Sequence, residues 1–235
     1  MEKGGGHTDK IAESLMEELN CETVFTIPVL GGIGVSESTV VTWIIMAVLV
    51  ALAIIFVRNL KVENPGKVQI ALESGIGWAE NFFGDVMGEK GKCYIPYLIT
   101  VLVYLAISNL IGLIGFKPPT KDLNVTAGLA IMSIVLIEAS GYRAKGFKGK
   151  LKSFAEPVPI VLPINILEIF IKPVSLCMRL FGNILGSFVV MELIKVLVPI
   201  LVPIPFSCYF DIFDGLIQAY VFVFLTALFI GEAVE

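Results

Sequence analysis

The run from Pro163 to Val198 reads PINILEIFIKPVSLCMRLFGNILGSFVVMELIKVLV and has few interruptions in its apolar character. As an α-helix it would be roughly 50 Å long, because each residue adds about 1.5 Å. The hydrocarbon layer of a membrane is only about 30 Å thick. No turn signal divides the run into a hairpin. We therefore expect one membrane helix that tilts steeply or kinks, with Pro173 as the site for a kink.

Charged side chains inside this run predict a functional site, because charge within a membrane span is costly. Asn165, Lys172 and Arg179 recur every seven residues and therefore share one face of the helix. Glu168 precedes Lys172 by four residues, so this pair has a structural explanation as good as a functional one. Arg179 has no acidic residue three or four positions away, and an arginine cannot deprotonate. We expect it to meet a carboxylate from elsewhere or a water-filled cavity.

The composition of the whole chain agrees with a membrane protein. Of its 235 residues, 56% are hydrophobic and only 16% are charged, and the mean hydropathy is +0.87. A soluble domain of this size needs more polar surface. The basic residues form no cluster on a soluble face, so nothing indicates nucleic-acid binding. The four cysteines show no metal-binding or redox spacing, and we predict no metal site and no cofactor.

Five segments are apolar over about 20 residues, the length that a helix needs to span a membrane. We predict an all-α integral membrane protein with an extracytoplasmic tail at residues 1–38 and one membrane domain at residues 39–235. The last two spans, joined by a proline-rich connection, would form a long tilted hairpin that suits a curved partner. The predicted spans are about 39–57, 94–116, 125–141, 163–198 and 207–231.

Two further segments are expected at the membrane surface. Residues 65–92 mix Trp78, Phe82 and Phe83 with acidic residues and glycines, which favours an amphipathic helix lying along the membrane. The segment from Val24 to Val35 is apolar but interrupted by glycines and a proline. It is too short to span, so we expect an extended or turn structure there.

Lysine and arginine in the short connections predict the orientation, because basic loops stay in the cytoplasm. The connections after the first and third spans are basic, whereas the others carry only Lys117 and Lys121 or no basic residue. The N-terminus is therefore expected outside and, with an odd number of spans, the C-terminus in the cytoplasm. The basic residues of the two cytoplasmic connections are Arg58, Lys61, Lys67, Lys90, Lys92, Arg143, Lys145, Lys148, Lys150 and Lys152.

Other polar side chains fall within the predicted spans. Asp211, Asp214 and Gln218 are spaced three and four residues apart and would share one face near the outer half of the last span. Glu138 lies near the cytoplasmic end of the third span. Asn109 in the second span has two equally open explanations, which are an aqueous access path and an interhelical hydrogen bond.

Several short motifs resemble one known family. KPVSLCMRLFGN, from Lys172 to Asn183, is similar to the signature of F-type ATP synthase subunit a and contains the central arginine. PPTKDLNVT, at residues 118–126, resembles the outer loop of that family, and PINILE, at residues 163–168, resembles the start of its long helix. Gln218 with Ala219 resembles its paired glutamine. The resemblance extends from the first span to the C-terminus and leaves out the tail.

The resemblance implies a mechanism for ion transport. A ring of hairpin subunits carries one carboxylate each, halfway across the membrane, and subunit a holds two offset half-channels for H⁺ or Na⁺. An ion enters by one half-channel, travels with the ring and leaves by the other, so that ion flow drives rotation and ATP synthesis. Arg179 would lie between the half-channels, where its charge favours the ionised carboxylate and blocks a direct leak.

The resemblance also implies partners and a location. The partners would be the c-subunit ring, subunit b of the peripheral stalk, the remaining F1Fo subunits and the lipid bilayer. The location would be a bacterial-type plasma membrane. The chain has no phosphate-binding loop, so it is expected to hold no nucleotide and to be no enzyme by itself.

Site residues follow from the resemblance position by position. Gln218 would lie close to Arg179, and Asn183 would line the same site. Asp122 and Asn124 would belong to the outer access path. Asn165 and Glu168 would lie on the cytoplasmic side, and Lys172 is also expected in the ion path.

The chain departs from the family at two positions. Many members have a carboxylate nine residues after the arginine, where this chain has Phe188, and some have a histidine where it has Asp211. Our hypothesis is that Asp211 and Glu192, together with Asp214, replace the usual pair in the outer half-channel. Glu192 lies one helical turn beyond Phe188 on a similar face.

Other classes of membrane protein explain the sequence less well. A polytopic secondary transporter with a buried arginine is the alternative, but it would need inverted repeats or paired broken helices, and the sequence shows no such symmetry. An intramembrane hydrolase would need a serine or metal-ligand constellation, and the sequence has neither HExxH nor GxSxG. An inert scaffold would leave Arg179 unexplained.

Overall fold

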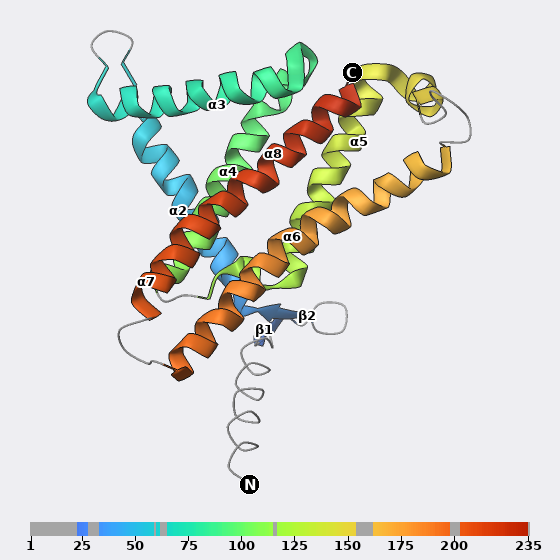
Figure 1. Ribbon diagram of the computed structural model, residues 1–235. Helices are drawn as coiled ribbons and strands as arrows, with labels where there is room; N and C mark the ends of the chain where they lie inside the picture. Colours follow the sequence, from blue (N-terminus) through green and yellow to red (C-terminus); the bar gives the residue numbers. More distant parts are fainter. Residues whose placement is uncertain are drawn as a thin grey trace.

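The structure is a computed structural model that describes residues 23–27, 33–58, 60–61, 65–114, 117–153, 162–197 and 203–234. Within these residues, five helical segments are long and apolar enough to cross a membrane, which confirms the predicted fold class. The helices that carry these segments are α2 (Glu37–Val57), α4 (Ile95–Leu110), α5 (Leu123–Ser153), α6 (Leu162–Leu197) and α8 (Gly215–Val234). Figure 1 shows that α2 begins and α8 ends at opposite ends of this bundle.

A small antiparallel hairpin precedes the helices. Strand β1 (Thr23–Ile27) pairs with strand β2 (Ile33–Ser36). This agrees with the extended structure expected for this segment and is the one departure from an all-helical chain among the described residues. Ser36 ends β2 in an extended conformation, and α2 begins at the next residue.

Helix α3 (Lys67–Gly91) lies across one end of the bundle (Figure 1). The chain bends within the last turn of α3 at Gly88, whose φ of 68° is a left-handed conformation that favours glycine. A short 3₁₀ turn (Lys92–Tyr94) then leads into α4. Gly231 of α8 permits the close crossing with α3, because a Cβ there would lie 3.0 Å from the backbone oxygen of Val86.

Two connections are more helical than the sequence predicted. Helix α5 continues past residue 141 to Ser153, where a loop was expected, and only Gly146, with a φ of 71°, departs from helical geometry. This turn lets Lys150 return to Glu138, with Nζ 3.4 Å from the carboxylate. The second half of the predicted proline-rich connection is also helical, because α7 (Pro203–Cys208) begins at its second proline. Proline is well suited to the first turn of a helix, where its missing N–H leaves no bond unmade.

Helices α6 and α8 run antiparallel and obliquely through the bundle (Figure 1). Helix α6 remains helical through Pro173 over its 36 residues. Tilting rather than a sharp break therefore accommodates its length. The last span starts with a π-helical segment, Tyr209–Asp214, before α8 continues as an α-helix.

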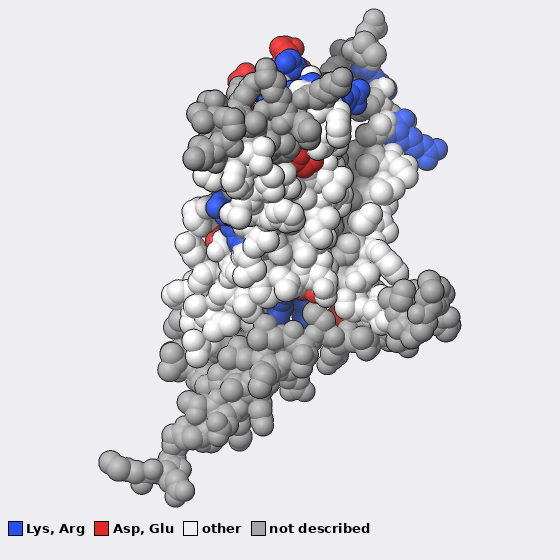
Figure 2. All heavy atoms as spheres, turned by 90° about the vertical axis from the view of Figure 1, so that its right-hand side faces the viewer, with Lys and Arg blue, Asp and Glu red and all other residues white. Residues whose placement is uncertain are grey.

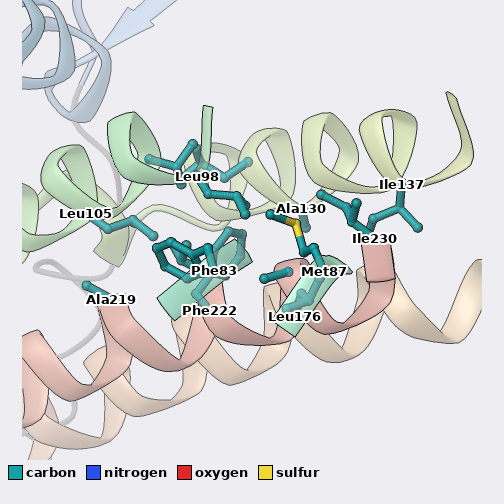
Figure 3. Close-up of a cluster of buried hydrophobic side chains, with 14 of the residues drawn as sticks. Phe83, Met87, Leu98, Leu105, Ala130, Ile137, Leu176, Ala219, Phe222 and Ile230 are labelled. Atoms are coloured by element: carbon teal, nitrogen blue, oxygen red, sulfur yellow. The ribbon is translucent and has the colours of Figure 1, made fainter. Parts of the chain in front are cut away.

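The hydrophobic core lies where α3, α4, α5, α6 and α8 meet (Figure 3). Phe83 of α3 points into this core and is 1% exposed. Phe222 and Ile230 approach it from α8, while Leu98 and Leu105 belong to α4. The amphipathic helix is thus held to the spans by apolar packing.

Phe83→Ala is expected to loosen α3 from the bundle, because it leaves a cavity in this core. Removing a buried phenylalanine costs about 3–5 kcal/mol of stability. Thermal unfolding of the purified chain in detergent would show a clearly lower midpoint. Trp78→Ala on the same helix is the matched control, since Trp78 is 61% exposed. Equal shifts for the two variants would contradict the packing role of Phe83.

On the face drawn in Figure 2, many charged atoms lie at the upper end and a few lie beside the grey lower part. One small group of basic and acidic atoms lies at mid-height on the left side, within an otherwise mostly uncharged surface. Large apolar side chains are exposed along the spans, especially on α2 and α6. An apolar belt between two charged ends is the pattern that a bilayer imposes.

Candidate functional site

Arg179 lies midway along α6 on an exposed face made of small and polar residues. Gly182, Asn183 and Gly186 belong to the same face. An added Cβ at either glycine would meet nothing within 4 Å. Among the described residues, no carboxylate lies within 4.0 Å of the Arg179 guanidinium. The helix therefore presents a fixed positive charge on an open surface.

Two polar bonds join α6 to the last span on the C-terminal side of Arg179. The Asn183 side-chain amide donates to Gln218 Oε1 at 2.7 Å, and the Ser187 hydroxyl donates to Asp214 Oδ2 at 3.2 Å. Both helices contribute residues four apart, so the two bonds are consecutive rungs between antiparallel helices. Gln218 is 2% exposed, and its Nε2 has no partner among the described residues.

The end of the bundle near η3 (Pro119–Lys121) gathers a second set of polar groups. Asp122 is only 3% exposed; its carboxylate accepts the Asn124 backbone N–H at 2.9 Å and the Ser36 hydroxyl at 3.3 Å. Lys121 Nζ lies 3.5 Å from the ring centroid of Phe188 on α6. The ammonium group of Lys121 thus contacts Phe188, the residue that stands where the family resemblance predicts a carboxylate.

Two predicted residues of this outer set lie outside the described side chains. They are Glu192 on α6 and Asp211 in the π-helical segment, so their grouping with Asp214 stays a prediction. The shared face of Asp211, Asp214 and Gln218 was inferred from an α-helical period. A π-helix has more residues per turn than an α-helix, so the residues before Gly215 point in different directions from those that an α-helical period predicts.

The opposite end holds a polar cavity of about 200 Å³ between α5, α6 and α8. Lys172 is central to it, with Nζ 3.4 Å from Glu168 and 3.0 Å from Glu232. The predicted local pair of Glu168 and Lys172 is therefore present, with a second carboxylate added from α8. The ionic and amide residues of the lining are Glu138, Lys145, Lys150, Asn165, Glu168, Lys172 and Glu232.

Glu232 is a site residue that the sequence pattern did not reveal. It stands near the end of the last span, where an acidic residue looks like an ordinary interfacial one. Its partner Lys172 is 60 residues away in the chain. The only signal in the sequence was that Glu232 interrupts the apolar residues of α8. Its pairing with Lys172 depends on the crossing of α6 and α8, which the sequence does not reveal.

The structure places polar groups on both sides of Arg179 along α6, toward the two ends of the span. The cavity around Lys172 lies about two helical turns, roughly 10 Å, from Arg179 along α6. The Asn183 and Ser187 bonds lie one and two turns beyond it on the other side. The chain thus offers two separate polar regions, displaced toward opposite ends of the span, with a cation between them.

Comparisons with known proteins give a consistent result. A model of the protein family described as "ATP synthase A chain" matches residues 39–231. "ATP synthase subunit a" of Moorella thermoacetica is 35% identical, over 88% of this chain and 94% of that protein. "ATP synthase subunit a 3" of Pelobacter propionicus is 37% identical, over 83% and 86% of the two chains. "ATP synthase subunit a, sodium ion specific" of Propionigenium modestum is 33% identical, over 86% and 75%.

Proposed function

The chain belongs to the family of ATP synthase subunit a, the ion-translocating membrane subunit of the F1Fo complex, and on this basis we propose a role for each of its polar regions. We propose that Arg179 is the stator charge that faces the carboxylates of the rotating c-ring. The two polar regions on either side of it serve as the two half-channels. This chain would bind no nucleotide and would act only within the assembled complex.

The single observation that carries this proposal is that Arg179 is exposed on α6 and unpaired among the described residues. A guanidinium stays charged in any protein environment. A positive charge within a few ångströms of a carboxylic acid favours its ionised form. A ring carboxylate that arrives opposite Arg179 would therefore release its ion, and the same charge would repel a cation passing directly between the half-channels. Gly182 and Gly186 leave room for a ring helix to approach.

The outer half-channel is assigned to the polar groups between the η3 end and Gln218. Asp122 and Asn124 stand at its mouth, and Asp214 with Ser187 leads from there toward Asn183 and Gln218. Buried carboxylates and amides in a membrane span are the groups that pass ions or order water. We keep Asp211 and Glu192 in this path as a hypothesis, on sequence position alone.

The inner half-channel is assigned to the cavity that holds Lys172. Its lining alternates acidic and basic groups, with Glu138 bound to Lys150 and two carboxylates bound to Lys172. Balanced charge supports water in a cavity without trapping a cation there. Asn165 adds an uncharged polar group to the same wall.

The orientation is assigned from the basic connections. Arg58, Lys67 and Arg143 lie toward the end of the bundle where α8 finishes, so this end is assigned to the cytoplasm. The N-terminal tail is then outside, α3 rests on the cytoplasmic membrane surface, and the membrane is a bacterial-type plasma membrane. Subunit b and the other F1Fo subunits would meet the faces that the ring leaves free.

Purification in mild detergent with a tag on this chain tests the proposal. We expect a ring of small hairpin subunits and the nucleotide-binding subunits to copurify, and we expect ATP hydrolysis in reconstituted vesicles to pump ions. Comparing hydrolysis with and without sodium identifies the coupling ion as H⁺ or Na⁺. A chain that purifies alone from an otherwise intact membrane would contradict the assignment.

Lys172→Gln is expected to slow ion release on the cytoplasmic side. The variant leaves the carboxylates of Glu168 and Glu232 without their shared cation, so they would hold a departing ion more tightly. ATP synthesis should fall by about 5- to 10-fold, the size of roughly 1 kcal/mol or slightly more. Lys92→Gln is the matched control, because Lys92 pairs with exposed Glu89, and such pairs contribute little. Equal activity in both variants would remove Lys172 from the path.

A further inference from the structure

Asn109 forms a buried polar connection that none of the roles assigned above uses. It lies on α4 and is 5% exposed. Its Nδ2 donates to the backbone oxygen of Gly215 at 2.8 Å, and its Oδ1 accepts the Thr120 hydroxyl at 2.8 Å. Of the two explanations open from the sequence, the interhelical hydrogen bond is the one that the structure contains.

The two partners of Asn109 stand next to the proposed outer half-channel. Thr120 lies in η3, two residues before Asp122. Gly215 directly follows Asp214 and is the first residue of α8 after the π-helical segment. The Asn109 side chain therefore connects η3, at the outer end of the proposed half-channel, to the junction between the π-helical segment and α8.

The contact at Gly215 is tight and depends on the absence of a side chain. A Cβ at Gly215 would lie 3.0 Å from Asn109 Cβ. The missing side chain lets the amide reach the backbone oxygen, where a larger residue would force α4 and α8 apart. π-Helical turns are rare and are frequently found at functional sites. A side chain that fixes the end of such a turn therefore sets the direction in which the neighbouring polar residues point.

We propose that Asn109 is a positioning residue of the outer half-channel, which holds the end of the π-helical segment so that Asp214 meets Ser187 and Gln218 meets Asn183. This inference rests on the function proposed above. Fixing Gly215 fixes the rotation of the residue before it and of the residue three positions after it. The amide contacts neither the ion nor the ring, and its effect passes through Asp214 and Gln218.

A purely stabilising role explains the residue less well. Replacing Asn109 alone would leave the buried Thr120 hydroxyl without its partner, which costs about 1–3 kcal/mol of stability. A loss of stability alone, however, lowers the amount of complex and not its apparent affinity for the ion. The neighbouring Ser108 shows the contrast. It is 0% exposed and has no side-chain hydrogen bond among the described residues, so it is buried on the same span without setting any register.

Asn109→Leu in the complete synthase tests the proposal. The measurement is ATP synthesis by reconstituted vesicles as the outer concentration of the coupling ion is varied, with the inner side held fixed. We expect the concentration for half-maximal synthesis to rise about tenfold, because the variant loses both buried hydrogen bonds that hold Gly215 and Thr120 beside the path. The maximal rate per assembled complex should change much less. A loss of folding would lower the amount of complex and leave the half-maximal concentration unchanged.

A double variant separates positioning from general stability. If Asn109 acts through Asp214, then Asn109→Leu should add little to the defect of Asp214→Asn, because interacting residues are not additive. Ser108→Ala is the matched control and should resemble the unmodified enzyme in both readouts. Multiplying losses in the double variant, or an unchanged half-maximal concentration in Asn109→Leu, would overturn the inference. Retained coupling in Arg179→Ala would instead overturn the proposed function, so the two failures are distinguishable.

Discussion

Arg179→Ala is expected to abolish ion-driven ATP synthesis while the complex still assembles. The side chain is exposed on α6 and has no ion pair among the described residues, so its removal leaves no buried partner unsatisfied. The variant loses the charge that favours the ionised ring carboxylate. Losing one preorganised electrostatic group of this kind costs about 100-fold or more in rate. The measurement is synthesis in vesicles per amount of assembled complex.

Arg143→Ala is the matched control for this experiment. Arg143 is an exposed arginine of α5 in the basic end of the bundle, and its loss should leave synthesis near normal. The vesicles with Arg179→Ala should also become leaky to the coupling ion, because nothing then separates the half-channels. Normal coupling in Arg179→Ala would refute the central assignment, whereas poor assembly of both arginine variants would point to a structural role for surface charge.

Gly186→Leu is expected to disrupt the contact with the ring without damaging the chain itself. A Cβ at Gly186 has nothing within 4 Å, and leucine is a better helix former than glycine. The bulk would therefore be accommodated by the isolated chain and resisted only by a closely packed neighbour. Overpacking costs roughly 1–3 kcal/mol, so synthesis and copurification of the ring should fall by about tenfold or more.

Gly128→Leu provides the comparison for Gly186→Leu. Gly128 is also a helical glycine with nothing within 4 Å of an added Cβ, but it lies on α5 beside an apolar groove formed with α2 and α4. Ring copurification should be unaffected there. If Gly128→Leu and Gly186→Leu behave alike, the face that carries Arg179 is not the ring contact.

Much of the site could be predicted along the chain because the deciding signals are local. The absence of a local acidic partner for Arg179 follows from the residue types three and four positions away, and the pairing of Glu168 with Lys172 follows from their spacing. The helical continuation of α5 was missed, since its basic residues resemble a loop. Gly146 explains this error, because one left-handed residue lets the chain turn back and pair Lys150 with Glu138.

The pairings across helices could not be predicted in the same way. Asn109 and Gly215 are 106 residues apart, and Lys172 and Glu232 are 60 residues apart. Lys121 meets Phe188 only because η3 reaches α6. No period in the sequence connects such residues, and many pairings would satisfy the same polar groups.

The sequence by itself determined the membrane class, the approximate spans and an arginine without a local acidic partner, because apolar length and residue spacing act over a few helical turns. The tertiary structure alone decided which polar groups meet. The physical reason is that buried polar groups need partners, and only the tilt and crossing of α6 and α8 bring Ser187 to Asp214 and Asn183 to Gln218.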